Sequence, residues 1–143
     1  MKELRTEIEI QAPAERVWQA ITELDKWSEW NPFIHHVDGK AKLGEKVDIT
    51  AGSGSNEMIL HCVVNKVEPN KELRWKYHVV LPFLFSGEHS FIIEQVEANK
   101  IRFIDREICN GLLVPTQAKN IDTITRQGFE AMDKALKVRA EQN

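Results

Sequence analysis

One histidine and two acidic residues carry the side chains best suited to chemistry, because the sequence places all three on the inner face of one sheet. Alternation between apolar and polar residues over 85–93 puts His89 on the apolar face. Over 101–108, Arg102 and Arg106 point to the same side of the strand, which should be the outer side because arginines are costly to bury. Asp105 and Glu107 then point to the inner side. A buried histidine beside a carboxylate can hydrogen-bond a carbonyl or hydroxyl group, or transfer a proton.

The hairpin between these two segments decides which acid His89 meets. If residues 97–99 form a three-residue loop with Asn99 in the left-handed conformation, His89 lies opposite Glu107. A shift of one residue on each strand brings Asp105 opposite instead, and shifts that break inside-outside parity are penalised. The sequence leaves three interpretations open: a polar pair that only fixes strand register, an anchor for a ligand, or a proton-transfer site with His89 as base.

The sequence pattern around these residues predicts an α+β fold. Alternation over 4–10 predicts a strand, and Pro13 followed by helically spaced apolar residues predicts two short helices that end at Asn31-Pro32. A helix of about 25 residues from residue 115 onward would be about 37 Å long, enough to cover one face of a sheet. Between them, strands with no intervening helix predict an antiparallel meander at 33–38, 45–51, 57–67, 72–81, 85–96 and 101–108.

Three tryptophans, Trp18, Trp27 and Trp30, lie within the short helical pair. So much aromatic mass either fills the end of a core or lines the mouth of an apolar cavity. Because this segment precedes a curled sheet and faces a long helix, we expect it to form a pocket rim, with Trp30 and Phe33 nearest the opening and Trp18 in the core.

Two other elements are expected to contribute to the inner face. Alternation places Trp75 and Tyr77 on the inner side of their strand. On the long helix, Ile121, Ile124 and Gly128 belong to the inner apolar stripe. A glycine there costs about 1 kcal/mol relative to alanine, which indicates either a void suited to a ligand or close packing of helix on strand.

Four stretches that together cover nearly the full chain carry a family resemblance. They are APAERVWQAITELDKWSEWNPF, GKAKLGEKVDI, GEHSFIIEQVEANKIRFIDRE and GLLVP. In this order they resemble the SRPBCC superfamily of START-like, helix-grip proteins, and within it the polyketide cyclase/dehydrase-like group. The resemblance implies a single domain over 1–143, with a seven-stranded curved antiparallel sheet wrapped around the long C-terminal helix. It also implies a deep apolar cavity that holds lipids, polyketides, hormones or other hydrophobic molecules.

The first functional expectation is therefore binding, transport or sensing of a hydrophobic or amphipathic small molecule between sheet and helix. The expected ligand contacts are Trp27, Trp30, Phe33, Trp75, Tyr77, His89, Phe91, Phe103, Glu107, Ile121, Ile124 and Gly128. The alternative is a polyketide cyclase or dehydratase in which His89, with Glu107 or Asp105, performs enolisation or dehydration. A second alternative is a protein-interaction domain like the Hsp90 activators of the same superfamily. VDGKAKLGEKVDI stands where that branch has an Asp-x-Arg-x-Gly-Gly-like pattern, so this option ranks last.

Composition argues against several other classes. A net charge of −3, with neither sign gathered into a block, disfavours nucleic-acid binding. No apolar run approaches the roughly 18 residues of a membrane helix, and MKELRTEIEI lacks the apolar centre of a secretory signal, so we expect a cytoplasmic protein. Cys62 and Cys109 are expected to be buried thiols, and the histidines lack ligand spacing, so we expect no metal and no cofactor. Monomer and homodimer both remain open.

Overall fold

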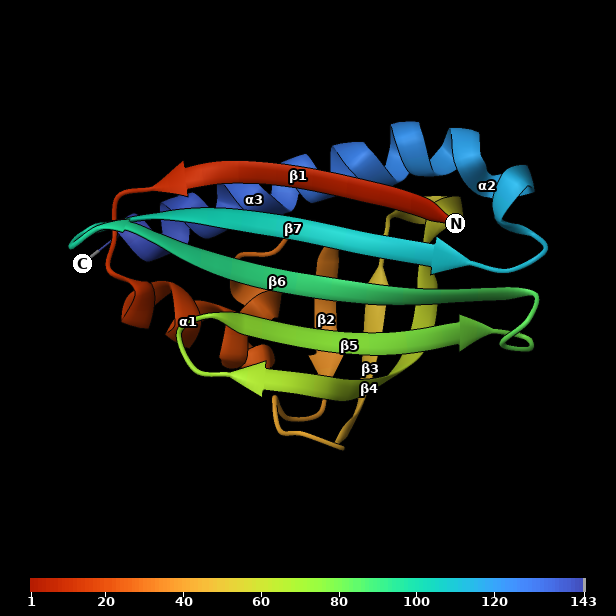
Figure 1. Ribbon diagram of the computed structural model, residues 1–143, viewed down its shortest axis with the longest axis horizontal. Helices are drawn as coiled ribbons and strands as arrows, with labels where there is room; N and C mark the ends of the chain where they lie inside the picture. The colour runs from red at the N-terminus through yellow and green to blue at the C-terminus, as the bar shows by residue number, and fades with distance from the viewer. Residues whose placement is uncertain (143) are drawn as a thin grey trace.

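The computed structural model describes residues 1–142, which form one sheet, short helices after its first strand and a long C-terminal helix (Figure 1). In chain order the elements are β1 (Lys2–Ile10), α1 (Ala14–Thr22), the 3₁₀ helix η1 (Leu24–Glu29), β2 (Ile34–Asp38), β3 (Lys46–Ala51), the 3₁₀ turn η2 (Gly54–Asn56), β4 (Met58–Glu68), β5 (Glu72–Val79), β6 (Phe85–Glu97), β7 (Lys100–Asn110), α2 (Val114–Asn120), the π-helical turn η3 (Ile121–Thr125) and α3 (Arg126–Glu141). The segments α2, η3 and α3 follow one another without interruption and make up the C-terminal helix.

The seven strands pair antiparallel in the order β1-β7-β6-β5-β4-β3-β2. The first strand therefore pairs with the last, and α1 with η1 carries the chain from one edge of the sheet to the other. In Figure 1 the strands β2 and β3 run across the direction of β6 and β7, so the sheet is strongly curled, and α3 lies alongside β1. The predicted α+β architecture of a curved antiparallel sheet, two short helices after the first strand and a long C-terminal helix is confirmed.

Two hairpins differ from the expectation. The strand β5 ends at Val79 rather than Leu81, because Val80 has a positive φ of 64° and starts the turn toward β6. The β6–β7 connection is also shorter than the predicted three-residue loop. Glu97 pairs with Lys100, a bulge between Gln95 and Glu97 takes up the extra residue, and Asn99 is not left-handed.

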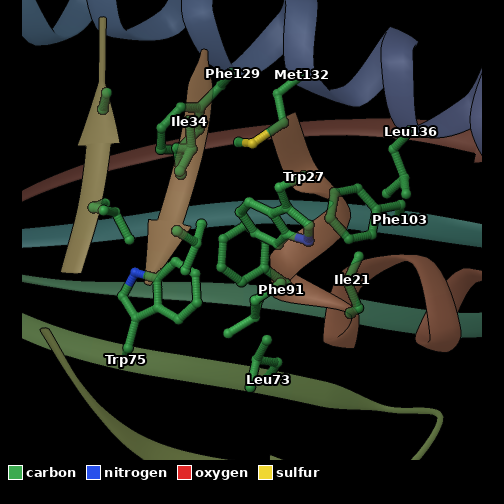
Figure 2. Packing of buried hydrophobic residues seen from close by; sticks show 14 of the residues in the cluster. Ile21, Trp27, Ile34, Leu73, Trp75, Phe91, Phe103, Phe129, Met132 and Leu136 are labelled. Carbon is green, nitrogen blue, oxygen red and sulfur yellow. The ribbon is translucent and has the colours of Figure 1, made fainter. Parts of the chain in front are cut away.

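Aromatic rings from three elements form the centre of the core. Trp27 from η1 lies 5.7 Å from Trp75 of β5 and 5.5 Å from Phe91 of β6, measured between ring centroids, and the last two rings are 5.0 Å apart. Figure 2 shows these rings on the inner side of the sheet, with Met132 and Leu136 reaching toward them from α3. All five side chains are buried. Tilted and edge-to-face contacts of this kind add to the stabilisation from burial, so η1 is anchored firmly in the core.

The C-terminal helix keeps the predicted inner stripe in α3 and at Ile121, but Ile124 of the π turn leaves it. Phe129, Met132 and Leu136 are buried, whereas Ile124 within η3 is 45% exposed. A π turn widens the helix and shifts the phase of the residues around it, so the 3.6-residue spacing that placed Ile124 inside does not hold there. Among the helices described within residues 1–142, none combines the length and the apolar character needed to cross a membrane.

Candidate functional site

The curled sheet and the C-terminal helix enclose a cavity of about 360 Å³. Its wall is mostly apolar, with side chains from the loop before β2, from β2 to β7 and from the C-terminal helix. The apolar wall residues are Phe33, Ile34, Ile49, Ala51, Met58, Leu60, Val79, Phe85, Cys109, Leu113, Ile121 and Phe129. Met58 and Leu113 are partly exposed, and so are the polar wall residues Gln117 and Asn120 of α2. The cavity therefore opens between β4 and α2.

Three buried polar side chains from adjacent strands lie together on the inner wall: Tyr77 of β5, His89 of β6 and Glu107 of β7. The Tyr77 hydroxyl donates a hydrogen bond of 2.9 Å to Oε1 of Glu107, two strands away. Gly87 makes this reach possible. It lies opposite Tyr77 on β6, and a Cβ atom there would approach the tyrosine ring to 2.4 Å. The bare glycine lets the ring cross β6 and meet the acid on β7.

His89 is held in one orientation by rings and by an acid. Its imidazole stacks between Phe91 and Phe129, with centroid distances of 4.1 and 4.7 Å. The backbone register places His89 opposite Glu107, as predicted, but its Nε2 lies 2.5 Å from Oδ1 of Asp105. Each alternative from the sequence thus describes one part of the arrangement: strand pairing with Glu107 and side-chain contact with Asp105.

Behind His89 lies a second acid that the sequence analysis missed. The hydroxyl of Thr6 on β1 donates a 2.6 Å hydrogen bond to Oδ2 of Asp133 on α3. The remaining oxygens, Asp105 Oδ2 and Asp133 Oδ1, are buried and meet no donor group within residues 1–142. A hydrogen bond between these two carboxyl groups therefore requires a proton on one of them. The carboxyl groups of Asp105 and Asp133 lie within hydrogen-bonding reach of each other, so with such a proton Thr6, Asp133, Asp105 and His89 are linked in a chain from β1 to the cavity.

Burial shifts the proton affinities of this chain. It lowers the pKa of His89 to about 4, so the imidazole is neutral near pH 7. It raises the pKa of Asp105 well above its usual range, with the charge of Glu107 acting in the same direction. Burial, followed by the neighbouring Asp105, raises the pKa of Asp133 to about 9. The two acids therefore retain at least one proton at neutral pH.

The direction of the His89 hydrogen bond decides what the ring offers to the cavity. When Asp105 accepts from Nε2–H, Nδ1 presents a lone pair, and when Asp105 carries the proton, Nδ1 presents an N–H. Nδ1 makes no hydrogen bond within residues 1–142, and His89 lines the cavity. The ring is thus able to accept a proton from a bound molecule or to donate one.

The two cysteines lie in strands and are buried, as expected. Burial raises the pKa of Cys62 and of Cys109 to about 12, so neither is a thiolate at neutral pH, although Cys109 lines the cavity. In the part of the chain that is described, no three histidine, cysteine or acidic side chains are grouped as metal ligands.

The structure brings only part of the predicted contact set to the cavity wall. The predicted residues that line it are Phe33, Tyr77, His89, Glu107 and Ile121. Those that lie elsewhere are Trp27, Trp30, Trp75, Phe91, Phe103, Ile124 and Gly128, and Asp105 lies behind His89 rather than on the wall. The expectation of direct wall positions is corrected for this second set.

The corrections have physical causes. Trp27, Trp75, Phe91 and Phe103 are almost fully buried against one another and against the core, because alternation distinguishes inside from outside but not core from cavity wall. Trp30 packs against Trp27 in a tilted arrangement, with ring centroids 5.6 Å apart, and lies at a separate surface hollow beside α1.

The space beside Gly128 is filled by Phe33. A Cβ atom on Gly128 would come within 2.2 Å of the Phe33 ring. The interpretation of this glycine as a site of close packing therefore holds, although the partner is a side chain of the loop before β2 and not a strand backbone. Phe33 is held by the helix on one side and faces the cavity on the other.

Asp133 carried a signal that could have been found in the sequence. It follows Phe129 by four residues and precedes Leu136 by three, which is the spacing of one helix face. An acid on an otherwise apolar face indicates a buried partner, because an isolated buried carboxylate is costly.

An apolar lip borders the cavity mouth. The loop between β5 and β6 exposes Leu81 and Phe83, and the loop before α2 exposes Leu112. The two loops are joined by backbone hydrogen bonds, from Leu112 N to Phe83 O at 3.1 Å and from Leu113 N to Leu84 O at 2.9 Å. Because Phe85 and Leu113 also line the cavity, the lip is continuous with its wall.

Comparison with known proteins places the chain in a family. The family model described as "Polyketide cyclase / dehydrase and lipid transport" matches residues 1–137. A search of the curated proteins found no match.

Solved structures share the fold at low sequence identity. An aromatase/cyclase from a Streptomyces species superposes with a TM-score of 0.79 at 12% identity, covering 98% of this chain and 93% of that chain. A protein from Mesorhizobium loti has a TM-score of 0.75 at 20% identity, covering 96% of each chain. A Thalictrum norcoclaurine synthase has a TM-score of 0.75 at 13% identity, covering 97% of this chain and 93% of that chain. These similarities confirm the predicted helix-grip fold.

Proposed function

Because the chain belongs to the polyketide cyclase/dehydrase and lipid transport family, we propose that it binds an amphipathic small molecule in the cavity between sheet and helix. The observation that carries the proposal is the distribution of the wall residues. Tyr77, His89 and Glu107 form one polar cluster, and apolar side chains make up most of the remaining wall up to the mouth. Such a site takes a molecule with one polar end and an apolar body.

The apolar wall supplies affinity and the polar cluster supplies orientation. Each CH₂ group that leaves water contributes about 0.8 kcal/mol, so the about 8 kcal/mol of micromolar binding corresponds to about ten buried CH₂ groups before the cost of association. The polar end is directed to Glu107 and to Nδ1 of His89, because a hydrogen-bonding group left against the apolar wall costs about 1–3 kcal/mol.

Titration with n-decanol, a neutral amphiphile, tests this proposal by isothermal calorimetry. Saturable binding of one decanol per chain is expected. Ala51→Phe places a ring in the cavity wall and is expected to abolish binding, whereas Ala131→Phe on the outer side of α3 is a matched control that leaves it intact.

Native mass spectrometry of the protein purified from its own host complements the titration by searching for a bound hydrophobic molecule. Circular dichroism establishes that both phenylalanine variants are folded. Saturable binding that is equal in wild type and Ala51→Phe would place the binding site elsewhere and overturn the proposal, as would no binding at all.

A second candidate function, acid–base catalysis on the bound molecule, is favoured by the His89–Asp105 contact. When Asp105 accepts the hydrogen bond from Nε2–H, the neutral imidazole on the cavity wall keeps a lone pair on Nδ1, which is the arrangement of a general base. It would remove a proton from the carbon beside a ligand carbonyl, as enolisation requires, and return a proton to the enolate.

Hydrogen–deuterium exchange at the carbons beside the carbonyl of 2-decanone, followed by NMR in D₂O, tests the catalytic candidate. Catalytic amounts of wild-type protein are expected to accelerate the exchange, and His89→Gln is expected to lose the acceleration while still binding decanol. If wild type and His89→Gln exchange at the same rate, His89 does not act as a base on this ketone.

A further inference from the structure

Glu107 is a carboxylate in an apolar cavity with no positive partner. Its side chain is 7% exposed and lies on the cavity wall. One oxygen accepts the hydrogen bond from Tyr77, and the other has no hydrogen-bond partner within residues 1–142. No lysine, arginine or histidine nitrogen among these residues lies within 4 Å of it, whereas the buried Glu72 on the outer face is paired with both Lys66 and Arg74.

The surroundings of Glu107 do not supply the missing charge. His89 is neutral near pH 7, because burial lowers its pKa to about 4. Burial, followed by the neighbouring Glu107, raises the pKa values of Tyr77, Cys62 and Cys109, so these groups also remain neutral. The polar cluster of the cavity therefore contains an acidic group with no basic partner in its wall, and a negative charge there is unfavourable unless a positive charge joins it.

We propose that the ligand supplies this charge: the cavity selects amphipathic molecules whose polar end is a protonated amine, with the ammonium group paired to Glu107. This inference rests on the proposed binding function and specifies its ligand class. An alkyl or aryl amine is charged at neutral pH, like a lysine side chain. Its N–H groups donate a hydrogen bond to the free oxygen of Glu107, and the opposite charges of the two groups add an attraction that an alcohol lacks.

The same arrangement rejects anionic amphiphiles. A fatty carboxylate would bring a second negative charge against Glu107 in a space that excludes most water, where charges interact more strongly than in bulk solvent. A neutral alcohol lies between these two cases, because it donates a hydrogen bond without balancing the charge.

Calorimetric titration with decylamine, n-decanol and decanoate near pH 7 tests this preference, because the three probes share one chain and differ only in the polar end. Decylamine is expected to bind about tenfold or more tightly than decanol, and decanoate more weakly than both. Glu107→Gln keeps an oxygen for the Tyr77 hydroxyl and is expected to lower the affinity for decylamine about tenfold, while the affinity for decanol changes less than about twofold.

Glu94→Gln is the matched control, because it removes the same charge from the outer face of β6, where Glu94 is exposed and paired with Arg102 at 3.2 Å. It is expected to leave all three affinities unchanged. Equal binding of decanol and decylamine to wild type, or a decylamine advantage that survives Glu107→Gln, overturns the inference while the binding function stands. Absence of saturable binding for all three probes overturns the binding function and this inference with it.

Discussion

Replacing Asp133 by asparagine is expected to stabilise the protein relative to wild type by an amount that grows as the pH rises. Asparagine has the same shape, its oxygen accepts the hydrogen bond from Thr6, and its N–H donates to Asp105 without a titrating proton. Asp133 keeps its proton in the folded protein up to a pKa of about 9, whereas in the unfolded chain it loses the proton near its ordinary value of 3.8.

The direction in which stability changes with pH follows from the number of protons bound in the folded and unfolded states. Between these two pKa values the folded state holds a proton that the unfolded state has released, so wild-type stability falls as pH rises, by about 1.4 kcal/mol per pH unit for one proton. From about pH 5 to pH 8, the variant is thus expected to gain about 4 kcal/mol over wild type. His89 acts in the opposite direction below its ordinary pKa of 6.5, because its folded pKa is lowered to about 4. Burial, the largest cause of that shift, is the same in both proteins, so most of this contribution is removed in the comparison.

Urea unfolding at several pH values measures this difference, with fluorescence of the buried Trp27 and Trp75 as the signal. Asp122→Asn is the matched control, since Asp122 is about half exposed and its ion pair with Lys2 lies at the surface. The control is expected to shift stability by the same small amount at every pH. A constant difference between Asp133→Asn and wild type over this pH range would refute the reasoning that Asp133 holds a proton in the folded state.

Two further substitutions test the packing around the cavity. Gly128→Ala is expected to destabilise the protein by about 1–3 kcal/mol in urea unfolding, despite the higher helix propensity of alanine, because the new methyl group meets the Phe33 ring. The double variant with Phe33→Leu is expected to recover part of the lost stability. No recovery would argue against this contact. Trp27→Ala is expected to lower the free energy of unfolding by about 3–5 kcal/mol but to leave the decanol affinity of the folded protein within about twofold. A loss of decanol binding by a variant that is still folded would mean that Trp27 belongs to the binding site.

Inside-outside parity is the part of the site that the sequence predicts well. The sequence places His89, Asp105 and Glu107 on the inner face and leaves Glu107 and Asp105 as the two candidates opposite His89; the structure agrees on the face and has Glu107 opposite. The register holds even though the loop geometry differs, because the bulge near Gln95 absorbs the residue that the predicted loop contained. Parity depends on the burial cost of every residue in the strand, whereas the loop depends on local backbone angles at a few positions.

Contacts that depend on side-chain direction could not be predicted in the same way. His89 turns its Nε2 toward Asp105 because Phe91 and Phe129 fix the ring plane, and the contact with Phe129 comes from a distant element. Trp27, Trp30 and Trp75 are predicted ligand contacts that lie off the cavity wall, because a ring that fills the core and a ring that lines a cavity have the same apolar sequence signature. Ile124 was misplaced because a π turn leaves no mark in hydrophobic periodicity.

The π turn at Ile121–Thr125 determines how α2, which precedes it in the C-terminal helix, is rotated about the helix axis relative to α3. A π turn contains one residue more than the α-helix it interrupts, and each residue of an α-helix accounts for about 100° of rotation. Deleting one residue there would leave a continuous α-helix and turn α2 by about that angle, carrying Gln117 and Asn120 away from the cavity mouth. The chemical character of the mouth is therefore adjustable by a change in chain length as well as by substitution, with α3 and its packing against β1 left in place.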